Sequence, residues 1–441
     1  MNGELTTLKT AAESALANAF AQVRGRLPGD HAVAAQRAAA FDLFAREGLP
    51  HRRVEEWKYT DLRALMREAK PLASPPDAAA KSGARSAGAI LGDVEARRLT
   101  FVDGAFVPEL SDLTALEPGL SLVPLAQALA EGEPALAYLG KIAPASDVAV
   151  ALNTALMGDG AVMRIAEGAM IERPLHLCFV ASNKPAAMFV RSLVIAAPGA
   201  RAMVIESHEG PSGSDYQVSS ALEMVVGNRA HIDHVKLIAD GAEALHVSTL
   251  AAAIAAHARF NAFTFTIGGA VIRNQLFLNF DGEDTVAGIG GATLIGGRQH
   301  ADTTLLANHI ARGCQSREVF KSVLDDQAHG VFQGRIVVRR GAQKTDAKMM
   351  TRALLLSERA EADNKPELEI YADDVQCGHG ATAGALDDEL KFYLMARGIP
   401  PAEAEALLIQ AFLGEAIEGI EHAGLREALM DSVSVWLKAR K

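Results

Sequence analysis

A stretch in the middle of the chain decides the fold: it reads Phe263-Thr264-Phe265-Thr266-Ile267, then Leu276-Phe277-Leu278, then Ala292-Thr293-Leu294-Ile295 and Thr303-Thr304-Leu305-Leu306. Gly, Asn or Asp residues separate these short apolar runs, and no clear amphipathic pattern of helical length lies between them. Runs of this kind, bounded by turn-forming residues, are typical of β-strands.

Similar runs extend from about Leu99 to Gly384, and many of their starts lie roughly 10–20 residues apart. This spacing fits an all-β sandwich, a barrel or a stack of β-coils. The region is long for one sandwich, whereas two strands per coil would give a solenoid with about 20–30 residues per turn. We therefore predict a mainly β protein in which residues 91–384 form a β-helix with a continuous core.

The N-terminal region has a different texture. Between Leu5 and Arg67, apolar residues recur at helical spacing, which predicts helices. The segment from Pro71 to Gly88 is rich in Ala, Ser, Pro and Gly and is expected to be a linker or mobile loop. We assign residues 1–90 to an N-terminal helical region and its linker.

Helical signals return after the β-region, so residues 385–441 are assigned to a C-terminal helical domain. Asp387 is the expected cap of a first helix, and Pro400-Pro401 opens a second one. The second helix carries an apolar stripe formed by Leu407, Leu408, Ala411 and Phe412. A bundle this small exposes apolar surface unless it packs on the β-domain or on a partner.

Bulk properties argue against several functions. A formal charge of −11 over 441 residues opposes a nucleic-acid partner, because phosphate binding needs a positive surface. No apolar run approaches the roughly 20 residues of a membrane helix, and Met1 to Thr6 lacks the build of a signal peptide. The three cysteines do not make a disulfide framework, and no phosphate-binding loop is present. We expect a cytoplasmic protein with reduced thiols that binds no nucleotide.

Five histidines in the expected strands are further candidates for functional sites. His231 and His234 lie three positions apart in an expected strand, so they face opposite sides and cannot readily share a metal ion. We predict that this pair belongs to the surface of a coil. His300, His309 and His329 recur among the later coils and are expected to be outward polar residues that could face a partner.

The cysteines differ in setting. Cys178 lies in a strongly apolar run and is expected in the core, whereas Cys314 lies among polar residues and is expected to be more accessible. Cys377 and His379 follow the alternating run Leu368 to Val375, so we expect them side by side at the mouth of a strand that glycines then break. Thiolate and imidazole suit iron–sulfur and zinc sites, although two ligands do not complete one. Local spacing alone leaves metal ligation and simple packing both open.

Two sets of motifs resemble the SufD branch of the SufB/SufD family, which serves iron–sulfur cluster assembly in the SUF system. The C-terminal set reads Cys377-x-His379-Gly380-Ala381-Thr382-x-Gly384, then Phe392-Tyr393-Leu394-x-x-Arg397-Gly398-Ile399, with Ala404 and Ala411-Phe412 after it. The early set reads Arg53-Val54-Glu55-Glu56-Trp57-Lys58-Tyr59-Thr60-Asp61-Leu62. SufB is the close alternative, but the N-terminal cysteine motif typical of SufB and its Glu at the position of Gly380 are missing from this sequence.

The resemblance implies a right-handed parallel β-helix between helical domains and a non-catalytic scaffold role. It implies pairing with SufB through the β-helix, binding of the ABC-type ATPase SufC, and the possibility of a homodimer in isolation. His379 matches the family histidine at the SufB–SufD interface, where a nascent iron–sulfur cluster shared with SufB is thought to form. Cys377 matches the motif cysteine, as a ligand or in an accessory role. A purely structural β-helix protein remains the main alternative from another class.

Overall fold

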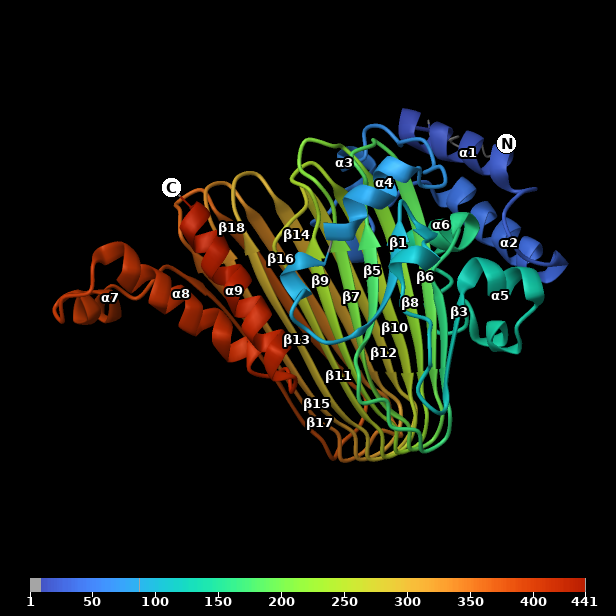
Figure 1. Cartoon of the computed structure of the whole chain (residues 1–441). Helices are drawn as coiled ribbons and strands as arrows, with labels where there is room; N and C mark the ends of the chain where they lie inside the picture. Colours follow the sequence, from blue (N-terminus) through green and yellow to red (C-terminus); the bar gives the residue numbers. More distant parts are fainter. Residues whose placement is uncertain (1–8, 87, 441) are drawn as a thin grey trace, which may run out of the picture.

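The computed structural model describes residues 9–86 and 88–440, so the predicted helix start at Leu5 and the stretch from Met1 to Thr6 lie outside the described residues. The protein is mainly β, with a parallel β-solenoid of about eight turns and helices at both ends (Figure 1). The predicted fold class is therefore confirmed. Among the described residues, no helix combines the length and apolar character needed to span a membrane.

The described strands form two sheets that run along the solenoid. Sheet B contains β1 (Arg97–Val102), β2 (Ala105–Phe106), β5 (Leu175–Val180), β7 (Arg201–Glu209), β9 (His231–Ala239), β11 (Arg259–Thr266), β13 (Val286–Ile295), β15 (Gln315–Leu324), β17 (Asp346–Leu355) and β19 (Gln376–Gly384). Sheet A contains β3 (Leu120–Pro124), β4 (Ala161–Ile165), β6 (Ala187–Ala196), β8 (Gln217–Val226), β10 (Leu245–Ile254), β12 (Val271–Phe280), β14 (His300–His309), β16 (His329–Val338) and β18 (Glu361–Ile370).

The chain alternates between the two sheets, so each coil contributes one strand to each of them. Strand pairing is parallel along the solenoid, while β1–β2 and β3–β4 pair antiparallel at its N-terminal end. Asn279 and Asn308 pair in register, are 29 residues apart, and share a hydrogen bond of 3.0 Å. This separation agrees with the predicted coil length.

The core of the solenoid lies between the sheets and is built by every second residue of each strand. Leu222, Met224 and Val226 of β8 are examples, and they pack with Val204 and Ile232 of sheet B. Because successive side chains of a strand point to opposite faces, the intervening residues face outward. This alternation decides which polar residues enter the lumen.

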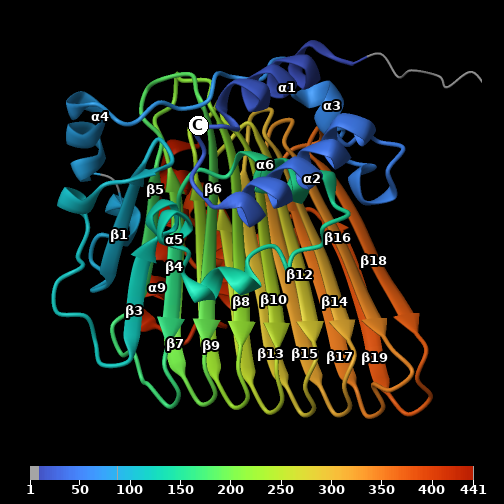
Figure 2. The same cartoon turned by 90° about the vertical axis from the view of Figure 1, so that its right-hand side faces the viewer.

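Helices cover the outer face of sheet A near its N-terminal half (Figure 2). They include α1 (Ala11–Val23), α2 (His31–Glu47), α3 (Leu62–Leu65), α5 (Leu125–Glu131) and α6 (Val148–Leu156), with short 3-10 turns η1 (Glu55–Trp57) and η5 (Pro134–Tyr138). The 3-10 turn η4 (Pro108–Leu110) packs instead against β1 of sheet B. Helix α6 lies between α2 and strands β6 and β8. The N-terminal part of the predicted β-region therefore contains helices as well as strands.

The predicted linker is more ordered than its composition suggests. It contains α4 (Ala78–Gly83) and η2 (Ala84–Ser86), and η3 (Ala89–Leu91) follows it. Leu72 forms a parallel bridge with Ala187, and the Asp77 side chain caps α4 while pairing with Lys184 at 2.6 Å. Backbone pairing and capping thus hold a segment that has little apolar bulk.

The C-terminal helices are α7 (Asp388–Met395), α8 (Pro401–Ile417) and α9 (Ala423–Ala439). The predicted cap at Asp387 and the helix start at Pro401 are confirmed. Helix α8 packs on β13 and β15, whereas α7 projects away from the solenoid (Figure 1). Of the predicted stripe, Leu407 is exposed, but Leu408 and Phe412 are half-buried, because α8 lies against the outer face of sheet B.

Candidate functional site

Cys377 and His379 lie inside β19, the last strand of sheet B. The predicted strand end was wrong, because β18 finishes at Ile370 and the glycines from Gly378 onward belong to β19 itself. Parallel pairing with β17 supplies the hydrogen bonds that keep this glycine-rich segment extended. The predicted relation between the two side chains holds, since residues two apart in a strand share a face.

That shared face is the lumen of the solenoid. Cys377 pairs with Ala347 and His379 with Met349, and both partners on β17 are buried in the main core. Cys377 still packs against this core and is half-buried, while His379 is exposed. The two candidate ligands therefore face inward at the coil where the described solenoid ends.

The thiol is not activated by its surroundings. Burial raises the pKa of Cys377, and the carboxyl groups of Asp346 and Glu318 act in the same direction. Glu318 faces the lumen on β15, and burial raises its own pKa to about 7. A metal ion would have to displace the thiol proton before Cys377 could bind as thiolate.

The described residues place no third ligand beside this pair. Across residues 9–86 and 88–440, the one group of three or more His, Cys, Asp or Glu side chains close enough to hold an ion is His231, Asp233 and Glu421. That group lies on the outer face of sheet B. A cluster at Cys377 and His379 would therefore need further ligands from a partner.

Burial corrects several predictions for the other candidates. Cys314 was expected to be accessible but is fully buried, and its thiol contacts the Gly282 carbonyl oxygen at 3.3 Å. His309 was expected to face outward but stacks on Phe280 inside the solenoid. Both errors arose because polar neighbours in sequence do not show which face of a strand is inward. Cys178 is buried as predicted.

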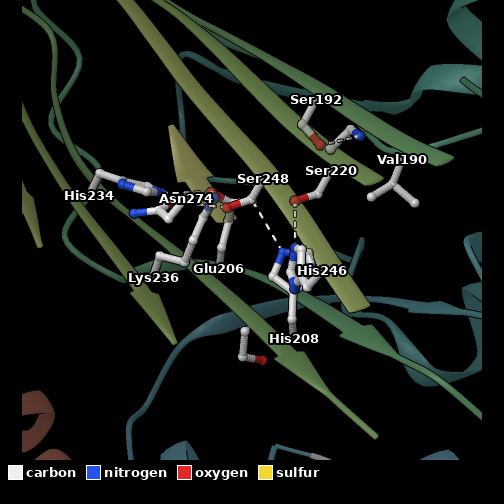
Figure 3. A network of polar contacts seen from close by, with 12 residues as sticks. Val190, Ser192, Glu206, His208, Ser220, His234, Lys236, His246, Ser248 and Asn274 are labelled. Carbon is white, nitrogen blue, oxygen red and sulfur yellow. Dashed lines mark hydrogen bonds and ion pairs between the residues drawn. The ribbon is translucent and has the colours of Figure 1, made fainter. Parts of the chain in front are cut away.

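His231 and His234 face opposite sides of β9, as predicted, but the surface role is wrong for His234. His234 is 1% exposed, and its Nε2 lies 2.8 Å from Glu206 Oε2. Burial lowers the pKa of His234. Lys236 Nζ lies 3.5 Å from the same Glu206 oxygen, so Glu206 holds a histidine and a lysine together inside the lumen (Figure 3).

Sequence reasoning missed this polar network (Figure 3). It continues to His246, whose Nε2 lies 3.0 Å from Ser220 Oγ and whose Nδ1 lies 2.7 Å from Asp240 Oδ2. His208 packs edge-on against the His246 ring, and burial lowers its pKa to about 4. The signal that could have revealed it is the alternation along each strand. These polar residues stand two or four positions from apolar residues that face the lumen, so they face the lumen too.

The early motif has a structural role in this chain. Trp57 is buried, and the guanidinium carbon of Arg273 lies 4.5 Å from its ring centroid. Thr60 Oγ1 lies 2.8 Å from His300 Nε2, and the His300 and His329 rings pack edge-on. The segment thus fastens the N-terminal region to the outer face of sheet A, and His300 contacts this chain's own N-terminal region.

Comparison with known proteins agrees with the motifs. Residues 12–177 match the SufBD protein N-terminal region, and residues 179–412 match the SUF system FeS cluster assembly, SufBD core domain. The chain is 32% identical to the iron–sulfur cluster assembly SufBD family protein slr0076 of Synechocystis, over 92% of this chain and 91% of that protein. It is 31% identical to the iron–sulfur cluster assembly protein SufD of Escherichia coli, over 87% and 88% of the two chains. With both family regions present in order along nearly its whole length, the chain belongs to the SufBD family of iron–sulfur cluster assembly proteins.

Proposed function

We propose that this chain is a non-catalytic scaffold subunit of a cytoplasmic SUF system, which pairs with a SufB-like paralogue and binds a SufC-like ATPase. The observation that carries the proposal is the position of Cys377 and His379, on the last strand of sheet B and facing the lumen. Two potential ligands at this place suit a site that is completed only when a second protein docks there.

The terminal coil also offers the means of docking. β18 and β19 are the last strands of their sheets, and most of their residues are exposed or half-buried. A strand at a sheet edge presents unpaired backbone groups that can pair with another strand. A paralogue with the same coil geometry would extend both sheets at once, and a second copy of this chain could use the same edge in isolation.

The nascent cluster would be shared across that junction as cargo of the complex. His379 is exposed and can offer a ring nitrogen, while a partner thiolate would supply the softer ligand. Cys377 is half-buried with a raised pKa, which favours an accessory role for its thiol. This arrangement supports the scaffold role rather than a SufB-like subunit that carries a cluster with its own ligands.

Apolar side chains on the C-terminal helices support the proposed ATPase contact. Phe392 is 72% exposed and Tyr393 53% exposed on α7, with Leu390 and Met395 beside them. Such a patch on a projecting helix is typical of a protein interaction site. The proposed contact therefore centres on α7 and includes the exposed Leu407 and Ala411 of the predicted α8 stripe, whereas Leu408 and Phe412 are half-buried.

Co-expression of this chain with the SufB-like and SufC-like proteins of its own cell tests the proposal. We expect a stable ternary complex that accumulates iron and acid-labile sulfide after anaerobic reconstitution. The substitution Phe392→Glu should abolish capture of the ATPase, and Val435→Glu, on a valine of α9 that is 66% exposed, should not. If the SufB-like and SufC-like proteins accumulate iron and sulfide equally well with and without this chain, the result would favour the purely structural alternative.

Deleting the chain after Gly384 would be a less direct test. The deletion would uncover the apolar outer face of sheet B, including Val235, Phe263 and Leu294, which α8 and α9 now cover. Loss of ATPase capture could then reflect aggregation. The paired substitutions avoid this problem because both side chains are exposed.

A further inference from the structure

Three side chains meet between the outer face of sheet B and the C-terminal helices. His231 and Asp233 face outward from β9, and Glu421 lies between α8 and α9. One ligand atom of each lies within 4.8 Å of the others, and His231 Nε2 lies 3.3 Å from Asp233 Oδ1. Zinc ligands at about 2.0–2.2 Å from the ion lie roughly 3–3.5 Å apart in a tetrahedral site, so small side-chain rotations would close the group.

The hydrogen bonds of these side chains leave room for an ion. Asn261 Nδ2 donates to Asp233 Oδ1 at 2.7 Å, and Arg259 Nη2 donates to Glu421 Oε1 at 2.9 Å, so each carboxylate keeps a second oxygen for a ligand. His231 Nε2 is buried, and beyond its 3.3 Å contact with Asp233 Oδ1 it has no hydrogen-bond partner among the described residues. A cavity of about 200 Å³ adjoins Asp233 and Glu421 and can hold waters that complete the coordination.

Positive charges nearby oppose a cation but are well solvated. Arg259 and Arg201 occupy the positions that pair with His231 on the two neighbouring strands. The Arg259 side chain is 54% exposed and Arg201 is also exposed, whereas Asp233 is only 18% exposed. Solvent screens the arginines more than Asp233, whereas the Glu421 side chain, at 53%, is exposed as much as Arg259.

We propose that His231, Asp233 and Glu421 form a binding site for a divalent transition-metal ion that ties the C-terminal helices to the solenoid. One imidazole and two carboxylates suit borderline ions such as Zn²⁺, Mn²⁺ or Fe²⁺. The site is separate from Cys377 and His379, which face the lumen. It uses His231 without His234, so it does not need the His231–His234 pairing that strand geometry excludes.

An ion at this site would link parts of the chain that are far apart in sequence. Without an ion, Glu421 is linked to sheet B by its ion pair with Arg259 of β11, in which both side chains are about half exposed. Such surface pairs contribute about 0–1 kcal/mol. Metal ligation is stronger, so the bound ion should hold the α8–α9 connection against β9 and limit local opening of the C-terminal helices.

Zn²⁺ binding to the full-length chain tests the proposal. The titration uses a Cys377→Ser and His379→Ala background, so that those two residues contribute nothing. We expect one Zn²⁺ per chain by calorimetry, and at least about tenfold weaker binding after Glu421→Gln or His231→Asn. Glu418→Gln, an exposed neighbour at the end of α8, is the matched control and should leave binding unchanged.

Limited proteolysis supplies a second measurement. Zn²⁺ should slow cleavage between α8 and α9 in the background protein, and Glu421→Gln should remove this protection. Glu421 is exposed, so its substitution leaves the core intact and the folded state can be verified by circular dichroism. Absence of Zn²⁺ binding, or equal affinity in the Glu421→Gln and Glu418→Gln proteins, would overturn the proposal.

Discussion

His234 and His379 occupy the same inward-facing row of sheet B, yet their surroundings are opposite. The row runs from His234 through Ala262, Ile289, Glu318 and Met349 to His379. His234 is 1% exposed and contacts Glu206, whereas His379 is exposed at the last strand. Residue type and strand geometry are equal, so position in the stack decides whether the imidazole is buried in a polar network or exposed.

The physical reason lies in the neighbouring strands. β9 has strands on both sides, so any polar group that enters its lumen must find partners within the chain. Burial opposes ionisation of Glu206, but Lys236 and the adjacent histidines hold its pKa well below the usual range. β19 pairs on one side with β17 and is the last strand of its sheet.

We expect the largest effect on stability in the buried network around His234. Glu206→Ala would leave Lys236 and His234 without their shared anionic partner in the lumen, which should cost about 3–5 kcal/mol of unfolding free energy. Chemical denaturation followed by circular dichroism would measure the loss. The double variant Glu206→Leu with Lys236→Met should recover a large part of it, and a single variant as stable as the parent would show that the network contributes little.

The middle of the row predicts a pH dependence. Burial raises the pKa of Glu318 from 4.5 to about 7, so the folded state holds a proton there that the unfolded state releases. The stabilisation is complete below about pH 4.5 and is lost as the pH rises through about 7. Between pH 5 and pH 8 this amounts to about 2–3 kcal/mol.

Glu318→Gln carries no such proton, so its unfolding free energy should fall less than that of the parent between pH 5 and pH 8. Denaturation curves of both proteins at the two pH values would measure the difference. Identical pH dependence in the two proteins would mean that Glu318 is ionised in the folded state and has partners that the structure lacks.

At the last strand of the row, substitution of His379 should change function with little change in stability. His379→Ala removes an exposed imidazole, so the unfolding free energy should change by no more than about 0.5 kcal/mol. In the complex with SufB-like and SufC-like partners, iron and acid-labile sulfide should fall at least about fivefold. Normal loading in an intact complex would show that this histidine is not a ligand.

Cys377→Ser should have the smallest effect. The thiol is half-buried with a raised pKa, so an accessory role predicts less than about a twofold loss of iron and sulfide. The same reconstitution and assay apply, with His379→Ala measured in parallel. A loss as large as that of His379→Ala would make Cys377 a direct ligand.

Much of the architecture followed from local patterns. Runs such as Phe263 to Ile267 showed strands, Asp387 and Pro401 marked helix starts, and the coil length fitted the pairing of Asn279 with Asn308. Hydrophobic periodicity and turn-forming residues act over a few positions, so they can be recognised from the sequence without knowledge of the tertiary structure. The motif around Cys377 and His379 likewise identified the residues of the candidate site before their surroundings were known.

Which face of a strand is inward, and which coil is last, depended on the tertiary structure. A period of two shows that Cys377 and His379 share a face, but both faces of a solenoid strand can be covered, as the burial of His234 inside and Val235 outside shows. Likewise, the approach of Glu421 to His231 and Asp233 depends on how α8 and α9 pack on sheet B. The sequence by itself determined the strands, the coils and the candidate ligand residues, whereas packing between segments far apart in sequence decided which of those side chains are exposed and which meet.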